Sequence, residues 1–215
     1  MKFRSLIAAA LALLVGASAQ ASISFVVNAD QLLSSSSIVI PDGSAVFIVA
    51  ATNGTFVTPT PGDYTVGSSW GNVTNTDLII YAVGSRTESG EQGVVDSTPT
   101  LTLGNGWATG DELALYWFPT ITYSAGGTVL TGGAGYGTFN SSSTGDDASD
   151  WVTPANSTSG YNLLYLTPGG ALLGPGNDVG TFGTVTSVPE PSTFALLGGV
   201  LALGAILRRR LASTA

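Results

Sequence analysis

Short runs of β-branched and aromatic residues, separated by turn-forming residues, fill the chain between residues 22 and 187. Val, Ile, Tyr, Phe and Thr favour strands, whereas Gly, Pro, Asn, Asp and Ser favour turns. No part of this region sustains the 3.6-residue apolar period of an amphipathic helix. The pattern predicts an all-β fold with strands at Ile23–Val27, Ala45–Ala50, Leu78–Val83, Thr100–Leu103, Glu112–Phe118, Tyr161–Leu166 and Gly180–Thr186.

These strands are expected to form a single antiparallel β-sandwich, jelly-roll-like in type, over residues 22–187. A domain of this length can bury a core without disulfides, and the chain has no Cys. Glu112–Phe118 is apolar enough for a central strand. Two polar segments, Ser85–Pro99 and Gly126–Ser149, are expected to be exposed loops. The predicted sandwich is flanked by an N-terminal signal helix and a C-terminal transmembrane helix.

Positive charge is confined almost entirely to the two ends of the chain. Five of the six basic residues lie there, so residues 22–188 keep one base, Arg86, against thirteen acids. Such a body is a poor partner for nucleic acid, and it lacks the Lys/Arg clusters that hold phosphate. The chain also has no His and no Cys. This excludes a Ser-His-Asp triad, a thiolate nucleophile and a zinc finger.

Residues 1–21 have the order of a secretory signal peptide. Lys2 and Arg4 precede a short apolar run, and small residues follow it. Two cleavage sites of the A-x-A type end at Ala19 and Ala21. We favour cleavage after Ala21, directly before the first predicted strand, so signal peptidase is an expected partner.

The C-terminal segment, residues 188–210, also has three parts in order. A Pro-rich hinge precedes the apolar run Phe194–Leu207, and the basic cluster Arg208–Arg210 follows it. As a helix the fourteen-residue run would be about 21 Å long, short of the roughly 30 Å hydrocarbon core. Snorkelling Arg side chains and local thinning of the bilayer can compensate. Basic residues favour the cytoplasmic side, so residues 211–215 are predicted to be a cytoplasmic tail and the body to lie outside.

The hinge contains Pro189-Glu190-Pro191, followed by Ser-Thr-Phe-Ala-Leu-Leu-Gly-Gly. Together with the apolar helix and Arg208, Arg209 and Arg210, it resembles the PEP-CTERM sorting signal. The resemblance implies processing by a membrane protease of the exosortase type, in Gram-negative bacteria that make exopolysaccharide. It also implies export, transient anchoring in the inner membrane, and a final place at the cell surface or outside the cell. The body has a looser resemblance to exported PEP-CTERM proteins of unassigned function, in the block from Gly110 to Thr122.

Carboxylates are the abundant titratable groups of the body. Pairs at Glu88/Glu91 and Asp111/Glu112 raise the alternative of a glycoside hydrolase or lyase, which needs two facing carboxyls. Asp111 and Glu112 are adjacent, however, and so point to opposite faces of a strand. Three further acids, Asp146, Asp147 and Asp150, could bind Ca²⁺, although solvated Asx turns account for them equally well.

Two tryptophans, Trp70 and Trp107, stand beside glycines in predicted turns. If both indoles are exposed on one face, they could stack on sugars. The sequence therefore predicts a non-enzymatic structural or interaction component of the cell envelope or exopolysaccharide matrix, with no catalytic residue and no cofactor except the calcium alternative. A carbohydrate-binding module is the first alternative.

Overall fold

The computed structural model describes the body of the chain, and the flanking segments that the sequence assigns to the signal peptide (1–21), the sorting signal (188–210) and the tail (211–215) lie outside the described residues. All thirteen elements within the described part are strands, so the all-β prediction is confirmed there. No helix in this part is long and apolar enough to cross a membrane. The described residues are 22–36, 38–71, 76–88, 90–104, 106–141, 143, 151–154, 159–165 and 180–186.

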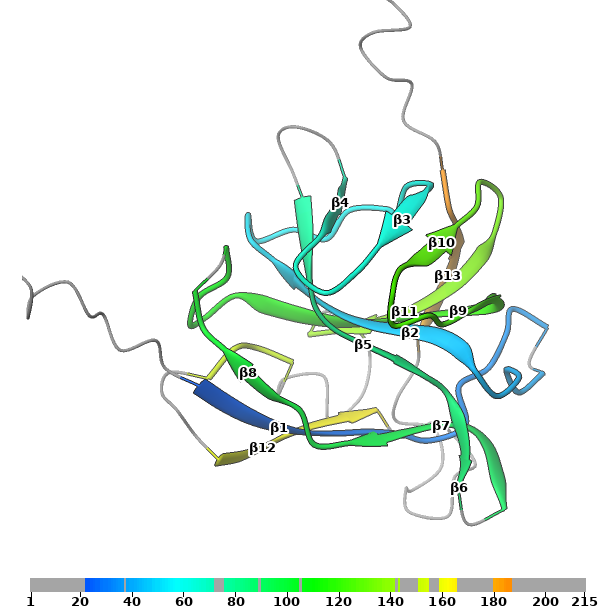
Figure 1. The fold of residues 1–215 in the computed structure, drawn as a ribbon, viewed down its shortest axis with the longest axis horizontal. Coiled ribbons are helices and arrows are strands. Elements are labelled where there is room, and N and C mark those ends of the chain that lie inside the picture. The colour runs from blue at the N-terminus through cyan, green and yellow to red at the C-terminus, as the bar shows by residue number, and fades with distance from the viewer. Residues whose placement is uncertain are drawn as a thin grey trace, which may run out of the picture.

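A six-stranded sheet forms the centre of the body (Figure 1). All its neighbouring strands are antiparallel. The apolar strand predicted at Glu112–Phe118 is central, because it pairs with β2 on one side and with β11 on the other. In spatial order the strands are β13 (Thr181–Thr184), β11 (Gly135–Asn140), β9 (Glu112–Thr122), β2 (Ser44–Ala51), β5 (Thr76–Gly84) and β4 (Ser69–Gly71).

A second sheet packs against one face of the central sheet. β1 pairs with β7 and with β8 along the same edge, and Pro99, which has no amide donor for a ladder, lies between those two strands. The sheet has the order β12-β1-β7-β6, with β8 beside β1. Its strands are β12 (Ser159–Tyr165), β1 (Ser22–Ala29), β7 (Glu91–Ser97), β6 (Arg86–Glu88) and β8 (Thr100–Thr102).

One strand pair departs from the predicted antiparallel arrangement. β1 and β12 run parallel, with Phe25 opposite Tyr161 and Val27 opposite Leu163. A hairpin forces its two strands to be antiparallel, but β1 and β12 lie at opposite ends of the body sequence and share no hairpin. Their direction is therefore set by packing, which a sequence pattern does not reveal.

A short ribbon of β3 (Gly62–Tyr64) and β10 (Thr128–Leu130) covers the other face of the central sheet. It lies above that sheet in Figure 1, whereas the second sheet lies below. The central sheet is consequently covered on both sides. The two main sheets enclose a shared core, as a β-sandwich requires, and the ribbon adds a third layer that the sequence analysis did not predict.

Alternation along β2 fills both cores at once. Val46, Ile48 and Ala50 point into the core between the two sheets, which we call the inter-sheet core. Ala45, Phe47 and Val49 point into the core under the ribbon, the ribbon core. Every residue of β2 is buried. Burial of each large apolar side chain contributes about 1.5–3 kcal/mol, so this strand supports both layers.

One glycine of β11 makes room for an aromatic ring. Gly137 lies opposite Trp117, and a Cβ at this position would overlap the indole ring. The same indole packs on Tyr165, with ring centroids 5.4 Å apart, and its Nε1–H donates to the carbonyl oxygen of Leu33 at 2.7 Å. The sequence analysis predicted a loop from Gly126 onward because of its many glycines. At Gly137, however, the glycine belongs to a packed strand.

Strands were found at all seven predicted places, but the two predicted loops are wrong in part. Ser85–Pro99 contains β6 and β7, and Gly126–Ser149 contains β10 and β11. In the first segment the buried side chains of Val94 and Val95 supply the core contacts of a strand. In both segments the apolar positions are too few and too widely separated by Gly and acids to give a clear period-2 signal.

Candidate functional site

The last described residues of the body form a hydrogen-bonded joint with two loops. Val185 is only 2% exposed; its amide donates to Ala134 O at 2.8 Å, and its own carbonyl accepts from the amide of Gly133 at 3.0 Å. One residue later, the amide of Thr186 donates to Pro59 O at 3.2 Å. We call these five residues the exit joint. The fold therefore holds the chain up to residue 186.

Pro59 belongs to the connection between β2 and β3, residues 52–61, which we call the strap. At its start the Thr52 hydroxyl donates to Thr76 O at 3.1 Å, and near its end the Tyr64 hydroxyl donates to Thr60 O at 3.0 Å. Phe56 and Val57 in its middle pack on the ribbon core. The strap thus lies across this core and contacts the exit joint through Pro59.

A buried carboxyl group holds the middle of the strap. Asp77 on β5 is fully buried, and its Oδ2 accepts hydrogen bonds from the Val57 amide at 3.0 Å and from the Trp70 indole Nε1–H at 3.2 Å. Its Oδ1 has no hydrogen-bond partner among the described residues. The sequence analysis missed Asp77, although an acid directly before the apolar run Leu78-Ile79-Ile80 was the available signal.

Burial dominates the electrostatics of this centre. Removal from water raises the pKa of Asp77 to about 7, although the Val57 amide and the Trp70 indole counteract part of the rise. Burial also raises the pKa of Tyr116, and the neighbouring Asp77 adds to that rise. The pKa of Tyr136 is raised by burial as well, while a hydrogen bond with Thr58 lowers it. The centre can hold a proton near neutral pH, next to two tyrosines that stay protonated.

Both tryptophans considered for sugar stacking are buried, so this expectation is corrected. Trp70 is 1% exposed and lies in the ribbon core, packed edge to face on Tyr116 with centroids 5.1 Å apart. Trp107 is 6% exposed and lies in the inter-sheet core, where its Nε1–H donates to Thr102 O at 3.1 Å. The two indoles occupy different cores and share no exposed face. Their neighbouring glycines supply the turns, whereas the rings supply core volume.

An open groove of about 560 Å³ lies where β9, β11 and β13 meet the loop around residue 35. Tyr136 and Phe182 line it, and Phe182 is 46% exposed although it packs edge to face on Trp117. Hydroxyl groups from the 34–36 loop, Thr120 and Thr184 complete the lining. The groove combines aromatic rings with hydroxyls and has no charged side chain among its lining residues.

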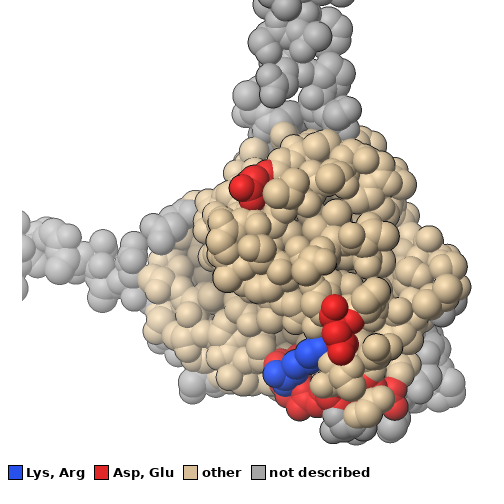
Figure 2. All heavy atoms as spheres, turned by 45° about the vertical axis from the view of Figure 1, so that its right-hand side comes forward, with Lys and Arg blue, Asp and Glu red and all other residues tan. Residues whose placement is uncertain are grey.

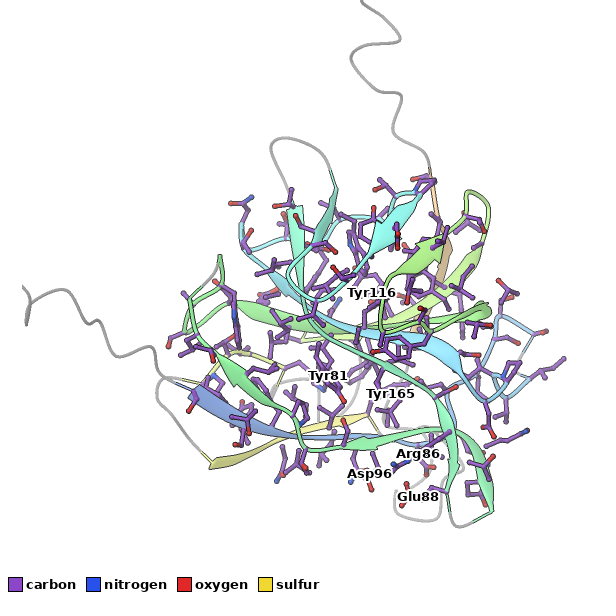
Figure 3. The ribbon with its side chains drawn as sticks, in the orientation of Figure 1. Tyr81, Arg86, Glu88, Asp96, Tyr116 and Tyr165 are labelled. Atoms are coloured by element: carbon purple, nitrogen blue, oxygen red, sulfur yellow. The ribbon has the colours of Figure 1, made fainter. Side chains whose placement is uncertain are left out.

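Arg86, the single basic residue in the sequence of the body, lies among acids at the end of the molecule opposite the exit joint (Figures 2 and 3). Arg86 Nη2 forms ion pairs with Glu88 and, at 3.3 Å, with Asp96. Glu91, paired with Glu88 across the β6–β7 hairpin, accepts a hydrogen bond from Gln31. Glu88 and Glu91 are thus engaged by neighbouring side chains on an exposed hairpin.

The second predicted acid pair has a turn role. Asp111 Oδ2 accepts from the Ala108 amide at 2.7 Å, which closes the turn that precedes β9. Glu112 begins β9, opposite Ala51. The candidate calcium ligands Asp146, Asp147 and Asp150 lie outside the described residues, as do Ala19, Ala21 and the sorting-signal residues. Within the described part, no group of three or more acids has an arrangement that could hold a metal ion.

Comparison with known proteins gives one match. Residues 187–210 match the family model of the PEP-CTERM protein-sorting motif. The chain therefore carries an export-linked, membrane-associated C-terminal signal of the kind that exosortase-like proteases process, and the match begins one residue after the exit joint. No curated protein and no solved structure matches the chain.

Proposed function

We propose that this exosortase-targeted protein is a structural or interaction component of the cell envelope or the exopolysaccharide matrix. Signal peptidase cleaves after Ala21, and the apolar run Phe194–Leu207 with its basic end holds the body outside the inner membrane. The exosortase-like protease then acts near Pro189-Glu190-Pro191. The processed body remains at the cell surface or leaves the cell.

The observation that carries this proposal is the junction between fold and motif. The body is hydrogen-bonded up to Thr186, and the matched motif starts at residue 187. A sorting signal attached to an independently folded domain should begin after the last residue that the fold requires, because processing must not remove such a residue. The exit joint lies entirely on the body side of the motif.

The charge of the body supports a place outside the cell. Thirteen acids against one base keep copies of the body apart and soluble, and they disfavour nucleic acid. Asp77 and Asp111 accept hydrogen bonds from backbone amides of the fold. Glu88, Glu91 and Asp96 contact neighbouring side chains at the β6–β7 hairpin. These observations favour a structural or interaction role over that of a glycoside hydrolase or lyase.

The processing step is tested in the native host by replacing Pro189, Glu190 and Pro191 together with Ala. The expected result is accumulation of the longer form in the membrane fraction. Ser187→Ala, at the first residue of the matched motif, is the control and should leave processing unchanged. Mass spectrometry of the released wild-type protein should show a C-terminus before Arg208. A released form intact through Arg210 would contradict the proposal.

The role of the body is tested by deleting the gene and by incubating the purified protein with the exopolysaccharide of its own host. A matrix or envelope role predicts altered matrix retention in the deletion strain. It also predicts no release of reducing ends or unsaturated sugars from the polymer. Release that is lost on replacement of a carboxylate would favour the hydrolase or lyase instead.

The groove beside Phe182 favours a second candidate function, glycan binding. Pockets of this size accept small ligands, and an exposed ring with surrounding hydroxyls suits the apolar face and the hydroxyls of a sugar. Titration calorimetry with oligosaccharides from the host polymer should give binding that Phe182→Ala weakens. Ile38→Ala removes an exposed apolar side chain outside the groove lining and should have no effect. Equal binding by both variants would exclude the groove.

A further inference from the structure

We infer that the anchored body presents one particular end to the lipid headgroups of the bilayer that holds its C-terminal run. This end, the exit face, consists of the exit joint, the turn at residues 131–134 and the ribbon of β3 and β10. The acidic end at β6 and β7 is held away from the lipid. The inference rests on the proposed function, because it requires Phe194–Leu207 to be in the membrane.

The last described residues of the body, up to Thr186, have a fixed place in the fold. β13 pairs with β11, Val185 is hydrogen-bonded to Gly133 and Ala134, and Thr186 is hydrogen-bonded to Pro59. Figure 1 shows β13 running to the same end of the body as the ribbon, while β6 and β7 lie at the other end. Figure 2, turned about the vertical axis, keeps the same separation between this end and the cluster of charged residues.

The tether between fold and membrane is short. Seven residues, 187–193, separate Thr186 from the apolar run. Fully extended, they span about 25 Å. The tether crosses one headgroup layer, which is roughly 5–8 Å thick, before it reaches the bilayer surface. Thr186 therefore stays within about 20 Å of the headgroups.

The body is larger than this reach. A compact domain of residues 22–186 has a radius of gyration of about 15 Å and hence a diameter of about 40 Å. If the acidic end faced the lipid, Thr186 would lie nearly one body diameter above the headgroups. That height is about twice the distance of about 20 Å that the tether allows. The tether thus excludes contact between the acidic end and the bilayer, and keeps the exit face near it.

The distribution of surface charge also favours the orientation in which the exit face lies near the lipid. Glu88, Glu91 and Asp96 gather at the far end with Arg86, where repulsion from anionic lipids is avoided. Residues 57–64, 128–134 and 184–186, all of them described, contain one acid, Asp63. The residue paired with it on the outer side of the ribbon, Val129, is 58% exposed. Because salt screens charge beyond about 8 Å, the tether length decides the orientation and the charge distribution only reinforces it.

The test places a fluorophore at one end or the other. The chain has no native Cys, so Thr131→Cys on the exit face and Gln92→Cys at the acidic end each give a single labelling site. Both side chains are exposed, and neither substitution changes the charge. The chain from Ser22 onward, uncleaved at its C-terminal motif and labelled with bimane, is reconstituted into phosphatidylcholine–phosphatidylglycerol vesicles that carry a nitroxide on the lipid headgroup.

The expected result is several-fold stronger nitroxide quenching at position 131 than at position 92. Equal quenching, or stronger quenching at position 92, would overturn the inference while leaving anchoring intact. A chain that fails to float with the vesicles would overturn the anchoring in the proposed function, and the inference with it.

A tether variant tests the reason for the orientation. Insertion of about twenty Gly/Ser residues between Thr186 and Ser187 raises the maximal reach to about 90 Å, more than twice the body diameter. Quenching at the two positions should then converge. If the difference persists with the long tether, tether length is not its cause and the argument fails.

Discussion

Asp77 makes a pH-dependent contribution to stability that can be measured separately from the other acids. Its pKa is raised from the ordinary value of 3.8 to about 7, with burial as the main cause. A carboxyl group whose pKa is higher in the folded state stabilises the fold fully below pH 3.8. This contribution is lost as the pH rises to about 7, because only the unfolded chain ionises freely in that interval. The loss amounts to at most about 4 kcal/mol, given 1.36 kcal/mol per pH unit.

Replacing the carboxyl by an amide should remove this dependence. In Asp77→Asn the amide oxygen can still accept from Val57 and Trp70, but the group carries no charge at any pH. Near pH 4 the two proteins should be about equally stable. At pH 8 the variant should be the more stable one, by up to about 4 kcal/mol.

Urea unfolding followed by Trp fluorescence, at intervals from pH 4 to pH 8, measures the effect. The informative quantity is the difference in unfolding free energy between wild type and variant at each pH, because contributions common to both proteins cancel. Asp63→Asn is the matched control, because it makes the same exchange at an exposed side chain, and the pH-dependent difference should be the larger for Asp77→Asn. A wild type that gains stability over the variant between pH 4 and pH 7 would refute the reasoning.

Three further substitutions, two of them paired with a control substitution, test the packing and the surface charge by urea unfolding. Gly137→Ala pushes a methyl group into the Trp117 ring and should cost about 1–3 kcal/mol, whereas Gly126→Ala, with open space around it, should be neutral or slightly stabilising. Ile48→Ala opens a cavity in the inter-sheet core and should cost about 2–5 kcal/mol, against less than about 0.5 kcal/mol for Ile38→Ala, whose side chain is 66% exposed. Arg86→Gln should cost less than about 1 kcal/mol, since its ion pairs with Glu88 and Asp96 are exposed. A large loss for Arg86→Gln that disappears in high salt would show that these pairs contribute more than we expect.

Strand positions could be predicted where a run of apolar residues is long enough to cover a core. β2 and β9 are the clearest cases, since the central sheet is buried on both faces and its strands read as continuous apolar runs. The three-residue strands of the ribbon carry no comparable signal. β3, with the sequence Gly-Asp-Tyr, owes its place to pairing with β10 and to the burial of Tyr64.

Residue roles were harder to predict than strands. Trp70 and Trp107 stand next to glycines, and a neighbouring turn suggested exposure; yet a turn fixes only the backbone, and both rings turn inward. The buried position of Asp77 was not predicted, because its hydrogen-bond partners, Val57 and Trp70, come from the strap and from β4. A buried acid is recognisable only when the groups that hydrogen-bond to it are known, and these depend on tertiary contacts.

The junction between body and signal has a simple physical basis in the sequence. Thr186 is the last residue that the described fold holds, and Pro189 follows three residues later. Proline lacks an amide donor, so Pro189 and Pro191 cannot extend the β13 ladder into the motif. A protease needs an unpaired, extended segment, and the residues that would prevent strand pairing are those of the tripeptide itself. β13 itself ends earlier, at Thr184. The prolines therefore make the tripeptide a poor strand partner, as a segment that a protease binds must be.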